Sequence, residues 1–190
     1  MDFQIQFPTP LATARVSFGQ RGIREACFVN DTDPKDKRKA DCVMANVTDE
    51  GLAKVLSKIQ SQDLSQIKKA VRCFSSLSPM PRPTLGFSPP LELTGTAFQV
   101  EVWNQIRQIP FGKTKSYQWI ANQLARPAAV RAVANACGSN TIAFLVPCHR
   151  VIRSNGELGG YRWGIHLKQR LLEWENEKAL HSEGRPIDPT

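Results

Sequence analysis

Apolar and polar positions follow three different patterns along the first half of the chain. Residues 14–29 (ARVSFGQRGIREACFV) alternate between the two kinds around Gly22, which is typical of a β-hairpin. Residues 30–41 carry many charges together with Asp and Pro turn signals, which favours an exposed loop. From residue 48 to residue 75 the apolar residues recur three and four apart, which predicts helix. We therefore expect this half to form an α/β unit.

A proline-rich stretch separates this half from the rest of the chain. Residues 75–90 (SSLSPMPRPTLGFSPP) contain five prolines and no helical period, so they are expected to form an extended linker. We place a domain boundary at the end of this stretch. The expected units are an N-terminal α/β domain over residues 1–90, a second domain over residues 91–178 and a flexible tail over residues 179–190.

Helical patterns dominate the chain after residue 93. Thr96 and Gln99 have the spacing of a capping box, and an apolar stripe follows from residue 98 to residue 109. Two shorter helices are predicted at 117–124 and 127–138, with a tight joint between them. This arrangement has the shape of a helix-turn-helix, although two short helices adjoin in many folds that do not touch DNA.

The end of the second half has a different pattern. Residues 141–147 (TIAFLVP) are too short and too apolar for a surface helix, and they predict a buried segment that runs into Cys148. A glycine-rich loop at 156–164 (GELGGYRWG) and an amphipathic helix at 165–174 are expected to follow.

The composition narrows the class of protein. The 41% hydrophobic and 22% charged residues are ordinary for a globular protein. No stretch approaches the ~20 apolar residues of a membrane span, and the N-terminus lacks the pattern of a signal peptide, so we expect a cytoplasmic protein with no membrane partner. The net charge of +8 is spread over both halves. It suits a polyanionic partner, and it equally suits a basic protein without one.

The five cysteines are expected to be reduced. Their number is odd, and no two of them form a CxxC pair. All three histidines lie at or after residue 149, so no spacing resembles a compact zinc site with four ligands.

Cys148 and His149 are the first candidates for chemistry. A thiol becomes nucleophilic as the thiolate, which needs a base or a positive charge nearby. Neighbours in an extended strand point to opposite faces, so direct contact between the two side chains requires a bend, and otherwise a water must bridge them. Pro147 favours such a bend. The alternative is a buried structural cysteine beside an unrelated histidine.

The surrounding sequence resembles one family. Five segments resemble, in order and at similar spacing, the O6-alkylguanine-DNA alkyltransferases, also called methylated-DNA–protein-cysteine methyltransferases, and together they cover about residues 92–175: GTAFQVEVW, IPFGKTKSYQWIA, RAVANACGSN, PCHRVI and GELGGYRWG. The N-terminal half resembles this family only loosely. The resemblance implies a small RNase H-like α/β domain, followed by a mainly α domain with a winged-helix-like helix-turn-helix.

The resemblance also implies a reaction and its partners. The cysteine sulfur attacks the O6-alkyl carbon of a damaged guanine, mainly a methyl group, and O4-methylthymine is a second candidate substrate. The resulting thioether is not easily displaced, so each protein acts once. The expected partner is double-stranded DNA containing O6-alkylguanine, with the target base flipped out of the stack. The expected protein is a monomer, and no metal or organic cofactor is expected.

The catalytic residues that the resemblance implies are Cys148, His149, Glu175, Asn140 and Tyr117. Cys148 matches the alkyl acceptor, and His149 matches the base that deprotonates it through a water. Glu175 matches the acid that orients this histidine. Asn140 matches an asparagine that braces the turn before the active-site segment. Tyr117 matches a tyrosine that packs closely against the phosphate of the target nucleotide and donates a proton or hydrogen bond to the flipped guanine.

Five further residues match positions that contact DNA or the base. Arg131 matches an arginine that fills the vacated stack, and the Val151 carbonyl matches one that reads the exocyclic amine of guanine. Tyr161 and Arg162 lie in the segment that matches the lid of the base pocket. Lys168 matches a lysine near the helix that carries Glu175.

Some residues depart from the family pattern. Cys137 and Gly138 stand where many relatives have larger or basic residues, which predicts weaker DNA binding. Trp163 stands where some relatives have glycine, and we expect it to narrow the pocket in favour of methyl over benzyl adducts. Arg150 has no chemical role in this account and is expected to anchor the segment.

Three other functions remain as alternatives. A lesion-binding relative that recruits other repair would lack the acceptor cysteine, whereas Cys148 is present. A helix-turn-helix transcription factor that responds to alkylation would carry a cysteine-rich metal site, and residues 1–90 have no such cluster. A cysteine hydrolase would normally have its base distant in the sequence.

Overall fold

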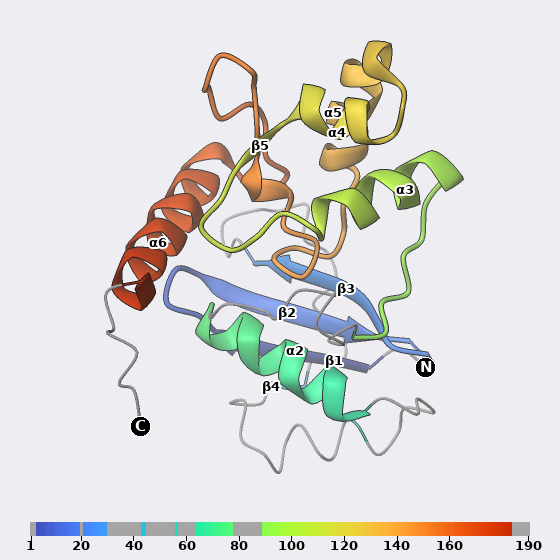
Figure 1. The fold of residues 1–190 in the computed structure, drawn as a ribbon. Helices are drawn as coiled ribbons and strands as arrows, with labels where there is room; N and C mark the ends of the chain where they lie inside the picture. The colour runs from blue at the N-terminus through green and yellow to red at the C-terminus, as the bar shows by residue number, and fades with distance from the viewer. Residues whose placement is uncertain are drawn as a thin grey trace, which may run out of the picture.

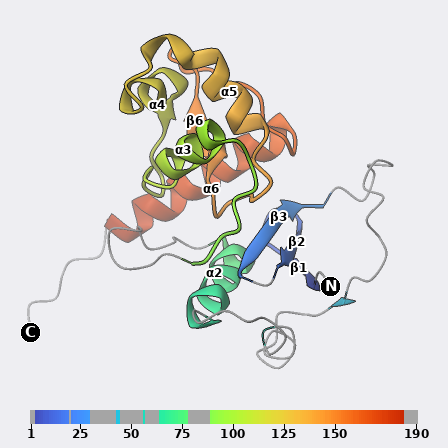
Figure 2. The ribbon, with the colours of Figure 1, turned by 90° about the vertical axis from the view of Figure 1, so that its right-hand side faces the viewer.

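The computed structural model describes residues 3–19, 21–29, 43–44, 56, 64–77 and 89–183. It shows a mixed α/β arrangement with a small sheet in the first half of the chain and mostly helices in the second (Figure 1). Helix α2 (Leu64–Ser76) covers one face of the sheet, and the second half of the chain lies beyond the edge strand β3 (Ile23–Phe28), whose backbone pairs with Leu91 and Ile142 (Figures 1 and 2). Among these residues no helix is both long enough and apolar enough to cross a membrane.

The sheet has the strand order β3-β2-β1-β4. Its strands are β1 (Phe3–Pro8), β2 (Thr13–Phe18), β3 (Ile23–Phe28) and β4 (Val43–Met44). The first three are antiparallel to their neighbours, and β4 runs parallel to β1. The hairpin predicted over residues 14–29 is confirmed as β2 and β3. Strand β1 was not predicted, although Phe3, Ile5 and Phe7 alternate with polar residues.

Helix α2 (Leu64–Ser76) packs on the sheet through a buried stripe at helical spacing: Ile67, Ala70, Val71 and Phe74. It confirms the predicted helix from residue 64 onward. The helix includes Ser75 and Ser76, so an extended segment cannot begin at residue 75 as predicted. Most of the earlier helical prediction and residues 78–88 of the predicted linker lie outside the described residues.

The second half begins with three helices. The sequence predicted the starts of the first two, whereas the third, expected from Pro127, begins as an α-helix at Val130. Helix α3 (Ala97–Ile106) has the complete capping box: Thr96 Oγ1 accepts from the Gln99 N–H at 3.3 Å, and Gln99 Oε1 accepts from the Thr96 N–H at 2.8 Å. The helix ends three residues before Ile109, the last position of the predicted stripe. Helices α4 (Tyr117–Gln123) and α5 (Val130–Gly138) pack against each other, with the 3₁₀ turn η2 (Pro127–Ala129) between them.

A buried segment joins the two halves and leads into the site. Residues 142–146 are almost completely buried, as predicted for the apolar run, and Ala143 and Ala26 are hydrogen-bonded through their backbones. The 3₁₀ turn η3 (Cys148–Arg150) follows, and then β6 (Val151–Ile152), which pairs in parallel with β5 (Lys115–Ser116). The buried apolar residues of both halves form one continuous cluster.

Helix α6 (Ile165–Glu183) is the last helix of the described residues (Figure 2). It continues well beyond residue 174, where the predicted amphipathic pattern ends. Its buried residues include Lys168, Leu171 and Glu175, which lie at helical spacing on one face. The helix contacts η3, which follows the buried segment.

Candidate active site

Cys148 begins η3 directly after Pro147, and only 4% of its surface is exposed. The turn replaces the extended strand that would have placed neighbouring side chains on opposite faces. Asn140 lies against the sulfur: its Nδ2 donates to Cys148 Sγ at 3.1 Å and to the Val146 carbonyl at 2.9 Å. Its Oδ1 accepts from the Ile142 N–H at 2.9 Å. Asn140 therefore braces the buried segment and also contacts the thiol, a contact that the sequence did not indicate.

The thiol of Cys148 is held in its protonated form at neutral pH. Burial raises the pKa of Cys148 to about 11, although the Asn140 hydrogen bond and the Lys168 charge act in the opposite direction. Ionisation of this thiol thus needs a base that takes up its proton.

His149 has the properties that such a base needs. It is completely buried, and its Nε2 lies 2.8 Å from Glu175 Oε1. Burial lowers the pKa of His149, and this effect outweighs the opposing effect of Glu175, so the imidazole is neutral. A neutral ring that donates from Nε2 has its lone pair on Nδ1. Nδ1 is buried and has no hydrogen-bond partner among the described residues, so it is available to accept a proton.

Glu175 is shared between His149 and Arg150. Arg150 donates to the carboxylate from Nε and Nη2, each at 2.9 Å, and from Nη1 to the Ile109 carbonyl at 2.7 Å. The Gly112 N–H also donates to Glu175 at 3.1 Å. Burial would raise the pKa of Glu175, but the effects of His149 and Arg150 outweigh it and lower the pKa to about 2. The carboxylate is therefore ionised.

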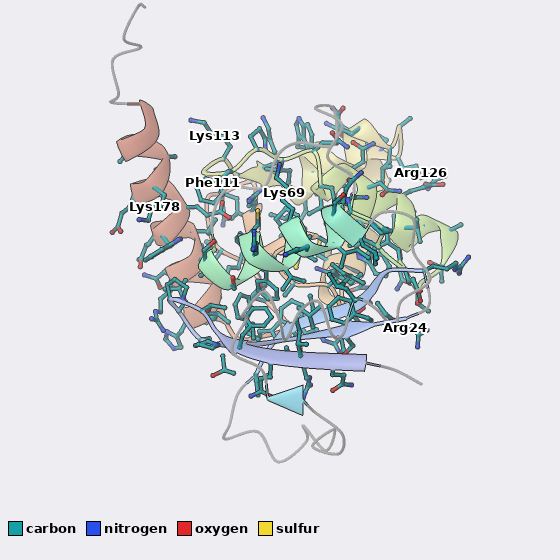
Figure 3. The ribbon with its side chains drawn as sticks, turned by 90° about the horizontal axis from the view of Figure 1, so that it is seen from below. Arg24, Lys69, Phe111, Lys113, Arg126 and Lys178 are labelled. Carbon is teal, nitrogen blue, oxygen red and sulfur yellow. The ribbon has the colours of Figure 1, made fainter. Side chains whose placement is uncertain are left out.

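Arg150 anchors its segment as predicted, and it also acts on the site through Glu175. Its guanidinium carbon lies 5.5 Å from the ring centroid of Phe111, which Figure 3 shows near α6. The sequence did not reveal the contact with Glu175, because 25 residues separate the two side chains. In the sequence, only the position of Arg150 next to His149 indicated that Arg150 lies near the site.

Lys168 ties the glycine-rich loop to β6. Its Nζ donates to the Val151 carbonyl at 2.6 Å, to the Gly160 carbonyl at 3.3 Å and to the Leu158 carbonyl. The side chain is buried, and burial lowers its pKa to about 8. The loop is thus held by a cation whose charge also acts on Cys148.

Two tyrosines line the same region. Tyr117 begins α4, and burial raises its pKa to about 12. A Cβ at Gly159 would come within 2.9 Å of the Tyr117 hydroxyl, and Gly159 has a φ of +67°, so this close approach requires glycine. The ring of Tyr161 stands edge-on to the His149 ring, with 6.4 Å between the centroids. Its buried hydroxyl has no hydrogen-bond partner among the described residues.

The structure brings most of the predicted residues together and places two at the surface. Cys148, His149, Glu175, Asn140, Lys168 and Val151 form a buried group, with Tyr117 and Tyr161 beside it. Arg131 and Arg162 are exposed, on α5 and on the glycine-rich loop. In the described part of the chain, no three His, Cys, Asp or Glu residues are grouped so that they could hold a metal.

The site thus combines a buried thiol, a histidine that is hydrogen-bonded to a buried carboxylate, and an adjoining pair of short helices. Residues 97–177 match the family described as 6-O-methylguanine DNA methyltransferase, DNA binding domain. The match covers 81 of the 190 residues, so it shows what the second half of the chain is similar to.

Curated relatives match about half of the chain. The Escherichia coli bifunctional transcriptional activator/DNA repair enzyme Ada is 55% identical over 91 residues, which are 47% of this chain and 26% of Ada. The inducible methylated-DNA–protein-cysteine methyltransferase of Bacillus subtilis is 54% identical over 93 residues, which are 49% of this chain and 52% of that protein. The chain thus spans only about a quarter to a half of these two relatives.

A solved structure matches nearly the whole chain. The crystal structure of Mycobacterium tuberculosis O6-methylguanine methyltransferase has a TM-score of 0.70 and 28% identity, and the match covers 99% of this chain and 97% of that one. The mixed α/β fold expected from the sequence is therefore confirmed.

Proposed function

We propose that this protein repairs DNA by moving an alkyl group, mainly methyl, from O6 of guanine to Cys148. A bond forms between Sγ and the alkyl carbon while the bond from that carbon to O6 breaks. The thiol proton passes to His149, and the guanine anion takes up a proton as it leaves. The stable thioether makes the protein a reagent that is used once. The observation that carries this proposal is the buried Cys148 beside a neutral His149 that Glu175 orients.

The proton path that we propose runs from Cys148 through a water to Nδ1 of His149. Glu175 accepts from Nε2, and this fixes the tautomer that leaves Nδ1 free. Arg150 keeps Glu175 ionised, so the imidazolium that forms lies beside a negative charge. Asn140 donates to the sulfur and can continue to do so when the sulfur is a thiolate.

The DNA partner that we propose is a duplex that contains O6-alkylguanine. Helices α4 and α5 have the arrangement of a helix-turn-helix, and Arg131 is exposed near the start of α5, where it can fill the space of a flipped base. Tyr117, Tyr161 and Arg162 would line the pocket for that base, which includes the Val151 carbonyl. A M. tuberculosis OGT with 28% identity and a TM-score of 0.67 has been crystallised in complex with DNA.

We also infer the finer fold classes and the organisation of the chain. Three antiparallel strands followed by β4 parallel to β1 are the arrangement expected of an RNase H-like domain. The α4–α5 pair with the short β5–β6 ladder supports a winged-helix-like second domain over residues 91–178. We propose that the protein acts as a monomer.

The decisive experiment measures transfer of a radiolabelled methyl group from duplex DNA that contains O6-methylguanine. We expect at most one methyl per chain, none on Cys148→Ala, and normal labelling of Cys137→Ala, which removes another buried thiol. O4-methylthymine DNA tests the second candidate substrate. Turnover beyond one methyl, or labelling of Cys148→Ala, would overturn the proposal. Lesion binding without transfer would indicate a recognition module instead.

A further inference from the structure

Six aromatic side chains form a closed circuit that runs through the site. Each ring lies against the next with 5.2–6.4 Å between centroids, within the range of favourable aromatic pairs. The members, in order around the circuit, are Phe28, Phe74, Phe144, His149, Tyr161 and Trp163. Two of them belong to β3 and α2, two to the buried segment and η3, and two to the glycine-rich loop. The N-terminal half therefore reaches the catalytic histidine through direct ring contacts.

Phe144 holds the central place in this circuit. Its ring is nearly parallel to the His149 imidazole, at 3° and 6.1 Å, and to the Phe74 ring, at 10° and 5.5 Å. Its φ of +63° lies in the left-handed region, where a bulky residue is strained. Such strain persists only where the surrounding structure enforces it, and it concentrates at functional sites. Here the strained backbone places the ring of Phe144 parallel to the imidazole of His149.

The hydrogen bond to Glu175 restrains the His149 ring only at Nε2. Because Nε2 lies close to the axis of the Cβ–Cγ bond, small rotations about this bond move Nε2 little and still change the direction of the Nδ1 lone pair. A neighbouring parallel ring restricts this rotation, because turning the imidazole out of its plane would change its packing against Phe144. Catalytic groups must be held within about 10–20° of their productive orientation by packing around them.

We infer that Phe144, backed by Phe74, is a positioning residue that sets the plane of the His149 imidazole for alkyl transfer. This inference rests on the proposed function. It gives the N-terminal half a part in the chemical step, because Phe74 comes from α2. Trp163 and Phe28, with 6.4 Å between their ring centroids, close the circuit on the side of the loop.

The test compares Phe144→Leu and Phe74→Leu with Phe18→Leu. Phe18 is a completely buried ring of β2 outside the circuit, and its variant serves as a matched control for lost core packing. We expect Phe144→Leu to lower the rate of methyl transfer at saturating DNA about tenfold, a part of the ~100-fold that a 1 Å misplacement can cost. Phe74→Leu should have a smaller effect in the same direction, and DNA affinity should not change for either variant.

A second readout separates positioning from stability. In Phe144→Leu the acid limb of the pH–rate profile should move to higher pH, because a less tightly packed imidazole loses part of the burial that lowers its pKa. Phe18→Leu should lose stability and keep both the saturated rate and the profile. The inference is overturned if Phe18→Leu slows transfer as much as Phe144→Leu, or if the two circuit variants react at the wild-type rate. If the wild-type protein accepts no methyl group, the proposed function itself has failed.

Discussion

Replacing Glu175 with glutamine should strongly destabilise the protein. The carboxylate is completely buried and accepts from Arg150, His149 and Gly112. In the variant the Arg150 guanidinium, whose side chain is only 8% exposed, keeps its charge and loses its counter-charge. Removing one partner of a buried pair costs about 3–5 kcal/mol. This is a large part of the ~5–15 kcal/mol that separates folded from unfolded domains.

Urea unfolding at pH 7 measures this effect. With a slope of about 2 kcal/mol per molar urea, the midpoint of Glu175→Gln should fall by about 1.5–2.5 M. The difference should also depend on pH. Because the pKa of Glu175 is lowered to about 2, its stabilisation is fully present above the ordinary carboxyl pKa of ~4.3 and is lost as the pH falls toward 2. The two midpoints should therefore converge between about pH 4 and pH 2.

An exposed pair supplies the control. Arg153 and Glu157 lie 2.7 Å apart, but both side chains are 60% exposed, so Glu157→Gln should leave the midpoint unchanged. The double variant Arg150→Met/Glu175→Gln removes both buried charges and should recover part of the loss. The reasoning would be refuted if Glu157→Gln and Glu175→Gln lowered the urea midpoint equally. It would also be refuted if the midpoint of Glu175→Gln stayed well below that of the wild type at pH 2.

Three further predictions concern reactivity. Iodoacetamide at pH 8 should modify Cys148 no faster than the same cysteine in the denatured chain, because burial raises its pKa to about 11; peptide mapping measures both rates. Methyl transfer should keep its rate as the pH falls through ~6.5 and decline only below it, because burial lowers the pKa of His149 and only the neutral ring accepts a proton; single-turnover kinetics from pH 5 to 8 check this. Trp163→Gly should make the protein more sensitive to O6-benzylguanine than the wild type, and equal inactivation of the two would contradict a narrowed pocket.

Local signals predicted the elements whose causes are local. The β2–β3 hairpin and the start of α3 at Thr96 follow from alternation and capping, which act within a few residues. The end of α6 was not predicted, because its residues after 174 have no regular apolar stripe. Strand β1 has the same kind of local signal, because Phe3, Ile5 and Phe7 alternate with polar residues, so it was predictable although it was not predicted.

The family resemblance implied most members of the candidate site and the contact between His149 and Glu175, but it did not imply the other contacts. Cys148 and His149 stand together in the sequence, but η3 and the buried segment determine how their side chains lie. The pairing of Arg150 with Glu175 and the stacking of Phe144 on Phe74 join residues far apart in the chain. No local spacing encodes such contacts, because they depend on where the tertiary fold places α6 and α2.

The charges around Cys148 show how a thiol with a raised pKa can still react in the proposed transfer. Before the reaction the buried group holds one close ion pair, Glu175 with Arg150, while the thiol and the imidazole are neutral. Moving the thiol proton to His149 creates two new charges. The imidazolium lies against Glu175, and the thiolate accepts from Asn140 in the field of the Lys168 cation. Each new charge thus meets a group already in place, so the burial that keeps the free thiol inert does not prevent its reaction once the substrate is bound.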